Sequence, residues 1–189
     1  GKAFLRLGVR VMADPLKLAG SVAELMRALA EVRRGAVRRL ANAEVVPVAV
    51  PAKDDRRFRD DAWTDEVVFD VIKQSYLLAT RWIENTVQGA HGLDKATARK
   101  VNFYTRQLVD ALSPSNFAVT NPTVLAATLE SGGLNLLKGL DNLLADLERG
   151  GGQLRISMTD SDAFTLGGNV AATPGKVVYQ NDLMQLIQY

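Results

Sequence analysis

Side chains that could carry out covalent chemistry are scarce in this sequence. Cysteine is absent, and His91 is the single histidine among 189 residues. A serine or cysteine nucleophile needs a neighbouring base, and zinc or iron sites need several cysteine or histidine ligands. His91 lies in the run Gly89-Ala90-His91-Gly92, which is typical of a solvated turn. The sequence therefore predicts no catalytic residue, no metal site and no cofactor site within this chain.

Two other patterns resemble reactive sites but lack their spacing. In the loop GNVAATPGK (168–176) the glycines stand too far apart for a phosphate-binding loop, and Val177 follows the lysine where serine or threonine is needed. The carboxylate pairs Asp54-Asp55 and Asp60-Asp61 are adjacent in sequence. Neighbouring side chains often point apart, so these pairs are interpreted as solvated loop residues rather than as acid–base pairs.

The densest run of charge, Lys53 to Asp61, stands directly before a long amphipathic segment, with Trp63 at the joint. Two interpretations stay open. The charges could be paired within the fold at the entry to a helix. Alternatively, the run could be a docking surface for a second domain or protein, with Arg56, Arg57 and Trp63 as contact residues.

The composition narrows the class of protein. With 47% hydrophobic residues the chain can bury a core, and 23 basic against 21 acidic residues leave a net charge of +2. A dedicated nucleic-acid-binding protein carries a larger basic excess, so no nucleic-acid partner is expected. No apolar run is long enough to cross a membrane. The absence of cysteine is compatible with a reducing cytoplasm.

A first helix is predicted to begin at Asp14, which can cap it, with Pro15 in the first helical position. Apolar residues recur along it at spacings of four and three, and this seam consists of Leu18, Val22, Leu25, Leu29, Val32 and Ala36. The remaining surface is basic, with candidate contact residues Arg33, Arg34, Arg38 and Arg39. The helix either packs on its own domain or binds a partner protein or an anionic surface.

Four more helices are predicted. The run VVPVAVPA (45–52) is an extended linker, because its prolines exclude a helix. A long helix runs from a Thr64 cap to Val87. Its wide apolar face consists of Val68, Ile72, Tyr76 or Ser75, Ala79 and Ile83, with Phe69, Leu77 and Trp82 beside it. The next helix covers 94–112, and its stripe consists of Ala98, Val101, Tyr104 or Thr105, Leu108 and Leu112. Asn121-Pro122 starts a helix that ends at Glu130, and 134–147 forms the last one.

The pattern changes after the glycines at 150–152. Residues 154–158 alternate, 177–181 alternate in part, and 183–189 read as a strand in which the chain stops. We therefore expect a piece of a longer protein. The predicted domains are an amphipathic basic helix over 1–44, a helical domain over 45–150 and the β-rich start of a further domain over 151–189.

Several long blocks occur in the order found in one family. The chain resembles the N-terminal region of class I polyhydroxyalkanoate synthases, also called poly(3-hydroxybutyrate) polymerases, from about Pro51 to its end. Residues before Pro51 match loosely, and Asp54 stands where the family pattern has glycine. The blocks are PAKDDRRFRDDAW (51–63), KQSYLL (73–78), FYTRQLVDALSPSNFAVTNP (103–122), DLERGGGQLRISMTD (146–160) and NVAATPGKVVYQNDLMQLIQY (169–189).

The resemblance implies a two-part enzyme that polymerises 3-hydroxyacyl-CoA to polyester and releases CoA. Its fold would be mainly helical at first, running into the first strands of a truncated α/β-hydrolase domain. The catalytic cysteine, histidine and aspartate would lie beyond Tyr189, so this chain alone is predicted to be inactive. The implied partners are the protein's own catalytic domain, a second copy in a homodimer, and the polyester granule surface or granule-associated proteins in the cytoplasm. The alternative is a stand-alone helical adaptor that binds another protein through the Leu18 to Ala36 seam.

Overall fold

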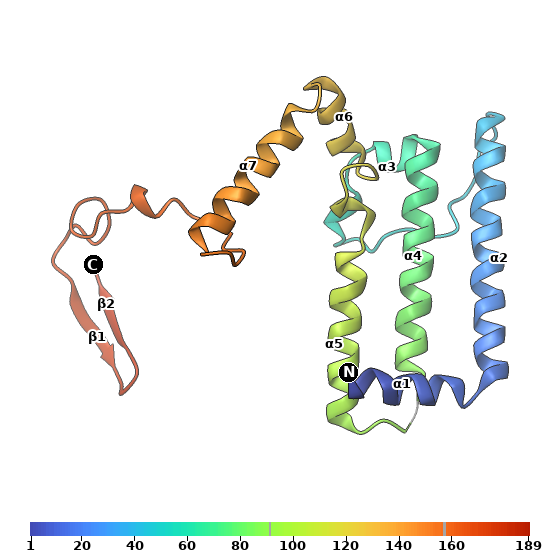
Figure 1. The fold of residues 1–189 in the computed structure, drawn as a ribbon, viewed down its shortest axis with the longest axis horizontal. Coiled ribbons are helices and arrows are strands. Elements are labelled where there is room, and N and C mark those ends of the chain that lie inside the picture. The colour runs from blue at the N-terminus through green and yellow to red at the C-terminus, as the bar shows by residue number, and fades with distance from the viewer. Residues whose placement is uncertain (91, 157) are drawn as a thin grey trace. The chain divides into compact units, whose positions relative to one another are not determined.

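The computed structural model describes residues 1–90, 92–156 and 158–189, so the predicted turn residue His91 lies outside the described part. The described residues form seven α-helices and one two-stranded sheet (Figure 1). The mainly helical prediction is confirmed, whereas a two-stranded sheet does not establish an α/β-hydrolase domain. Over the described residues, no helix combines the length and apolar character that crossing a bilayer requires.

The chain divides into two compact units, Gly1–Gly133 and Leu134–Tyr189. The first contains α1 (Lys2–Met12), α2 (Pro15–Leu40), α3 (Ala62–Asp65), α4 (Val67–Gln88), α5 (Lys95–Ala111) and α6 (Pro122–Glu130). The second contains α7 (Leu134–Arg149), β1 (Lys176–Gln180) and β2 (Gln185–Gln188). The predicted ranges 1–44, 45–150 and 151–189 place α7 with the other helices instead, and they stay a prediction.

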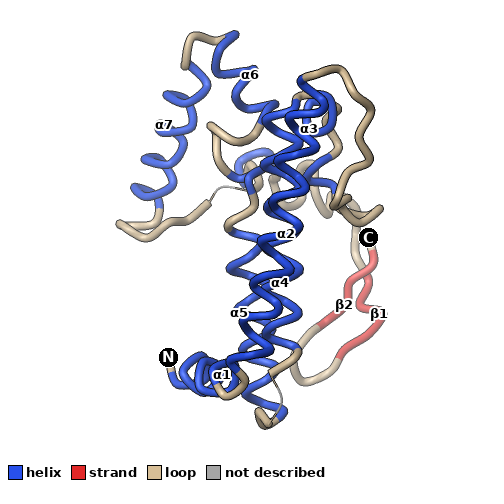
Figure 2. The backbone as a smooth tube through the Cα atoms, turned by 90° about the vertical axis from the view of Figure 1, so that its right-hand side faces the viewer, coloured by secondary structure: helices blue, strands red, loops and turns tan. Residues whose placement is uncertain are grey.

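Three long helices build the first unit. Helices α2, α4 and α5 run side by side in an up-down-up order, and α4 in the middle contacts both neighbours (Figures 1 and 2). Helix α1 crosses the lower ends of these helices and contacts all three. The predicted basic seam helix is therefore part of a helical bundle, and its apolar side packs on α4 of the same unit.

Capping residues set three helix starts, and the caps at Asp14 and Asn121 were predicted. Asp14 Oδ1 accepts from the backbone nitrogen of Lys17 at 3.0 Å, and Asp94 Oδ1 accepts from that of Thr97 at 2.9 Å. Asn121 Oδ1 accepts from the backbone nitrogens of Thr123 and Val124. In each case a side-chain oxygen satisfies a donor that the first helical turn leaves free.

The helix predicted from Thr64 to Val87 is interrupted, which corrects its start. Residues 62–65 form the short α3, and Glu66 is extended, with φ −85° and ψ 116°, before α4 begins. Thr64 does not cap a helix. Its carbonyl and that of Asp65 accept from Arg39 Nη2 at 2.7 and 3.0 Å, so these carbonyls bond to α2 instead of continuing a helical ladder.

The buried side of α4 differs from the prediction in part. Val68 is 67% exposed, and the polar residues Asp70, Lys73 and Gln74 are buried. Leu77 is buried as predicted, and Ile72 and Tyr76 pack partly buried against the core. The polar side of α4 is buried because α2 and the 45–52 linker pack on it and form hydrogen bonds with Asp70 and Gln74. The positions of the apolar residues along α4 do not indicate this packing. On α5 the same rotation occurs: Val101 and the alternative residue Thr105 are buried, as predicted, but Leu108 and Leu112 are exposed.

The predicted linker 45–52 is non-helical and packs on α4. The backbone nitrogens of Val48 and Ala49 both donate to Gln74 Oε1, at 2.7 and 3.1 Å. Gly35 lets the linker approach α2, because a Cβ there would lie 3.1 Å from Val45 Cγ1. The linker lies within the compact unit Gly1–Gly133.

The second unit contains a helix and a hairpin. Strands β1 and β2 pair antiparallel, with Lys176 opposite Gln188 and a register shift between Val177 and Tyr179. The strand predicted at 154–158 is wrong over its described residues. Strands need a partner, and the backbone nitrogen of Arg155 bonds instead to the carbonyl of Asp146, at the end of α7, at 3.4 Å.

Candidate interaction site

Trp63 lies inside the first unit rather than on its surface. Its side chain is 1% exposed and packs with Phe58, Leu77 and Ala49. The ring of Phe58 meets it edge-on, with centroids 4.9 Å apart. As folded, Trp63 therefore stabilises the joint between the linker and α4 and presents no surface to a partner.

Arg57, also predicted as a contact residue, joins three segments. Its Nε and Nη2 donate to the two carboxylate oxygens of Asp55, both at 2.9 Å, and its Nη1 donates to Tyr76 Oη at 2.9 Å and to Asp110 Oδ1 at 3.0 Å. These bonds tie the charged run to α4 and α5. Hydrogen bonds from Arg57 hold the pKa of Asp55 below its usual range. Arg56, in contrast, is exposed.

Arg39 belongs to a buried polar cluster that also contains Asp70, Lys73 and Gln74. Asp70 Oδ2 accepts from Arg39 Nη1 at 2.8 Å and from Gln74 Nε2 at 2.9 Å, and Lys73 Nζ lies 3.0 Å from Asp70 Oδ1. Asp70, Lys73 and Gln74 are 5–7% exposed. The cluster joins α2, α3, α4 and the linker, so Arg39 is occupied within the unit.

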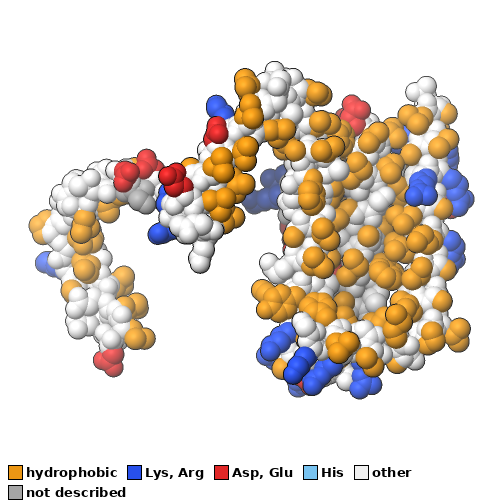
Figure 3. Space-filling view, in the orientation of Figure 1, with side chains coloured by type: hydrophobic (Ala, Val, Ile, Leu, Met, Phe, Trp, Pro, Cys, Tyr) orange, Lys and Arg blue, Asp and Glu red, His pale blue; other side chains and the backbone are white. Residues whose placement is uncertain are grey.

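The other predicted arginines of α2 lie on its outer side. Arg33, Arg34 and Arg38 are exposed, and Arg34 pairs with Glu31 of the same helix at 3.1 Å. Basic side chains are visible along the outer edge of α2 (Figure 3). The structure therefore separates the six predicted arginines: Arg33, Arg34, Arg38 and Arg56 are accessible, whereas Arg39 and Arg57 are held in internal networks.

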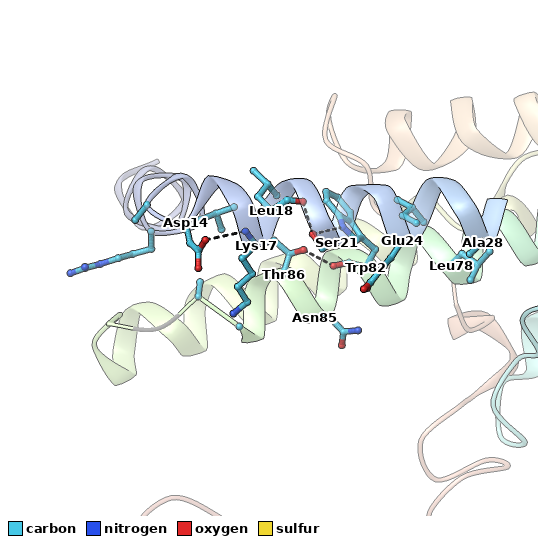
Figure 4. A pocket seen from close by; sticks show the side chains of 16 residues that line it. Asp14, Lys17, Leu18, Ser21, Glu24, Ala28, Leu78, Trp82, Asn85 and Thr86 are labelled. Carbon is cyan, nitrogen blue, oxygen red and sulfur yellow. Dashed lines mark hydrogen bonds between the residues drawn. The ribbon is translucent and has the colours of Figure 1, made fainter. Parts of the chain in front are cut away.

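A groove of about 500 Å³ lies between the first half of α2 and the second half of α4 (Figure 4). Leu18, Leu25 and Leu78 give it apolar walls. Trp82 Nε1 donates to Ser21 Oγ at 3.2 Å, and Ser21 Oγ donates to the carbonyl of Leu18 at 2.9 Å. The Ser21 hydroxyl thus bonds to a carbonyl rather than to a base, and the groove offers no activated nucleophile.

The buried polar side chains of the described residues pair with one another. No group of three His, Cys, Asp or Glu side chains in the described part of the chain is placed to hold a metal ion. Of the buried side-chain nitrogens and oxygens in this part of the chain, none lacks a hydrogen-bond partner. The 168–176 loop leads into β1 at Lys176 instead of into a helix, which a phosphate-binding loop requires.

Residues 54–189 match the family described as "Poly-beta-hydroxybutyrate polymerase (PhaC) N-terminus". The chain belongs to this family. The resemblance found in the sequence is thereby confirmed.

Curated polymerases extend the match to the rest of the chain. Poly(3-hydroxyalkanoate) polymerase of Methylorubrum extorquens is 46% identical over 188 residues, which is 100% of this chain and 31% of that protein. The polymerase subunits of Rhizobium meliloti and Cupriavidus necator are 39% and 40% identical over 94% and 79% of the chain. The chain thus spans less than a third of the length of these relatives. No solved structure matches it.

The sequence prediction missed the buried polar cluster of Arg39, Asp70, Lys73 and Gln74 in the first unit. Asp70, Lys73 and Gln74 recur at the spacing of one helix face, and that signal was present in the sequence. Their partner Arg39 lies 31 residues before Asp70, and periodicity within one helix does not reveal such a pairing. Residues 1–44 were predicted as one amphipathic basic helix beginning at Asp14, and the separate short helix α1, which has an apolar and a basic side, was not predicted.

Proposed function

We propose that this chain is the non-catalytic N-terminal part of a polyhydroxyalkanoate polymerase. In this proposal the whole protein polymerises 3-hydroxyacyl-CoA to polyester with release of CoA. The chain itself docks on the catalytic domain, supports the active dimer and associates with the polyester granule or its proteins in the cytoplasm. The catalytic cysteine, histidine and aspartate would belong to the remaining part, in an α/β-hydrolase domain whose first strands are β1 and β2.

The apolar surface of the second unit carries the docking part of this proposal. Helix α7 has no buried residue, and its leucines fall on one side at spacings of three and four. We call them the α7 leucine face: Leu136, Leu137, Leu140, Leu143 and Leu144, each 43–58% exposed. Apolar surface of this extent favours burial against a partner.

The hairpin supports the same proposal. A two-stranded hairpin is marginally stable in water unless more strands or a helix cover it. Both strands are exposed along their whole length, including Val177, Tyr179 and Ile187 at 41–52%. In this proposal, residues that the longer relatives have in addition to this segment supply the strands or helix that cover the hairpin.

The test measures CoA release from 3-hydroxybutyryl-CoA by the separately expressed remainder of the polymerase, with and without this chain. We expect the chain to raise the rate and to co-purify with the remainder. Leu140→Glu places a charge in the α7 leucine face and should weaken both effects. No change in rate and no co-purification would contradict the docking role.

The matched control is Asn142→Glu. Asn142 is exposed on the side of α7 away from Leu140, so the same charge is added to the same helix without touching the leucine face. We expect Asn142→Glu to behave as the unmodified chain. Equal losses in both variants would mean that charge on α7, rather than its leucine face, determines the outcome.

The adaptor alternative is favoured by one observation, the exposed arginines Arg33, Arg34 and Arg38. The seam packs on α4, and these arginines are basic side chains of α2 that remain accessible to a partner. Reversing their charge should abolish capture of an acidic partner, and survival of capture would exclude this surface. Arg39 stays unchanged in that variant, because its loss would break the Asp70 cluster.

A further inference from the structure

Helix α1 carries a second apolar strip on the side that the bundle does not cover. Leu5, Val9 and Met12 are 71%, 64% and 70% exposed, and their spacing of four and three places them on one side of the helix. We call these three residues the α1 strip. The packed side of α1 consists of the partly buried Ala3, Leu7 and Val11. Helix α1 is therefore anchored to the bundle and still presents apolar side chains outward.

A basic row borders the α1 strip. Lys2, Arg6 and Arg10 recur at intervals of four and are exposed, and α1 contains no acidic residue. Arg6 has one nearby carboxylate, that of Asp94 at 3.6 Å, and both side chains are more than half exposed. The row thus remains cationic on the surface.

The starts of α2 and α5, next to α1, add further exposed apolar and basic side chains. Leu16, in the first turn of α2, is 85% exposed, and Lys17 follows it. Helix α5, whose cap Asp94 pairs with Arg6, carries the exposed Lys95 and Arg99 in its first turns. Basic and hydrophobic side chains gather together over the α1 end of the unit (Figure 3).

This arrangement fits an interface between water and lipid. Helices with an apolar side and a neighbouring row of Lys and Arg lie in the plane of a membrane surface, with the apolar side at the acyl boundary and the cations at the headgroups. Helix α1 runs crosswise to the bundle axis and lies on the outside of the bundle near one end, so its outer side can lie flat on a surface (Figures 1 and 2). The absence of acidic residues from α1 favours an anionic lipid.

We propose that α1 and the start of α2 adsorb to an anionic phospholipid surface. The α1 strip and Leu16 enter the acyl boundary, and the basic row lies at the headgroup phosphates. The inference goes beyond the proposed function, because it requires neither the rest of a polymerase nor polyester. Either proposal can fail while the other holds.

The test is flotation of the chain with vesicles of phosphatidylcholine alone and of phosphatidylcholine mixed with phosphatidylglycerol. We expect binding to the mixed vesicles that falls as salt is raised, because exposed charges are screened. Leu5→Glu with Val9→Glu should weaken binding by more than about tenfold. No binding to mixed vesicles, or equal binding to both kinds, would overturn the proposal.

The matched control is Leu108→Glu with Leu112→Glu on α5. These leucines are 59% and 57% exposed, so the control changes equally accessible apolar residues away from α1. Binding should be unchanged in this variant. An equal loss of binding would show that apolar surface in general, and not α1, holds the vesicle.

Two further measurements locate the contact. Lys2→Gln and Arg10→Gln should each weaken binding by about fivefold, since a basic residue near an anionic surface contributes about that factor. A Val9→Trp probe should be quenched by brominated acyl chains, whereas the buried Trp63 should not. A Val9→Trp signal that brominated lipid leaves unchanged would show that the α1 strip stays in water, against the proposal.

Discussion

Residues 1–133 and residues 134–189 place their apolar side chains in opposite ways. The first unit buries Trp63, Phe58, Leu77 and Val101 and joins its helices through the Arg39 and Arg57 networks. Of the described residues after 133, none is buried, although leucine is frequent along α7. The first unit thus has a core of its own, while the second has apolar surface suited to a core shared with another part of the protein.

Removal of the largest core side chain should affect the first unit most. Trp63→Ala should lower the free energy of unfolding by about 3–5 kcal/mol, because it leaves a cavity among Phe58, Leu77 and Ala49. Denaturant unfolding followed by circular dichroism measures this. Leu140→Ala in α7 is the control and should change stability by less than about 0.5 kcal/mol. Similar losses of unfolding free energy in both variants would contradict the claim that only the first unit has a core of its own.

Breaking the buried polar cluster should come next in size. Asp70→Asn leaves Lys73 buried without its anion, and we expect a loss of about 3 kcal/mol in the same unfolding measurement. Asp141→Asn on the exposed side of α7 should have no effect beyond about 0.5 kcal/mol. A double variant, Asp70→Asn with Lys73→Met, should recover part of the loss, and a failure to recover would mean that the lysine charge is not its cause.

The Asp55–Arg57 pair should give a pH-dependent contribution of about 1–2 kcal/mol at neutral pH. The folded state lowers the pKa of Asp55, so the contribution is complete above the unfolded pKa of about 4 and is lost as the pH falls through the folded value. Asp55→Asn should therefore destabilise the chain near pH 7, and the difference should vanish in acid. Unfolding curves at several pH values test this, and a constant difference would assign the effect to packing instead.

The smallest expected effect concerns the second unit. Leu140→Glu should leave the stability of the isolated chain within about 0.5 kcal/mol of the original, because the side chain is 51% exposed. The same substitution is expected to weaken docking on the remainder of the polymerase. A large loss of stability in the isolated chain would show that the α7 leucine face is already covered, contrary to the comparison.

Local signals in the sequence predicted most helices, because capping is a short-range effect. The Asp14-Pro15 and Asn121-Pro122 pairs mark helix starts that the structure confirms. The buried side of α4 could not be predicted in this way, since it depends on Arg39 and Val48, which come from other segments. The burial of Trp63 could not be predicted from its neighbours in sequence either, because it depends on contacts with Phe58 and Leu77 that form only in the folded chain.

The sequence predicted that α2 has a basic surface, but it did not predict which arginines belong to that surface. The basic side of α2 is present, but Arg39 does not belong to it, because its guanidinium donates hydrogen bonds to Asp70 and to two backbone carbonyls within the unit. Helix α1 was not predicted as a separate helix because it has no side-chain cap at its start and contains Gly8, which lowers helix propensity. Its periodicity, with Leu5, Val9 and Met12 beside a basic row, was the signal that could have revealed it.

The up-down-up order of α2, α4 and α5 has a consequence for biosynthesis. Helices that are neighbours in both sequence and space form few distant contacts, and such proteins fold in microseconds to milliseconds. A ribosome adds about 5–20 residues each second, so the bundle is complete soon after it emerges. The α7 leucine face and the hairpin then remain the exposed apolar surface of the nascent chain while synthesis continues, available to chaperones.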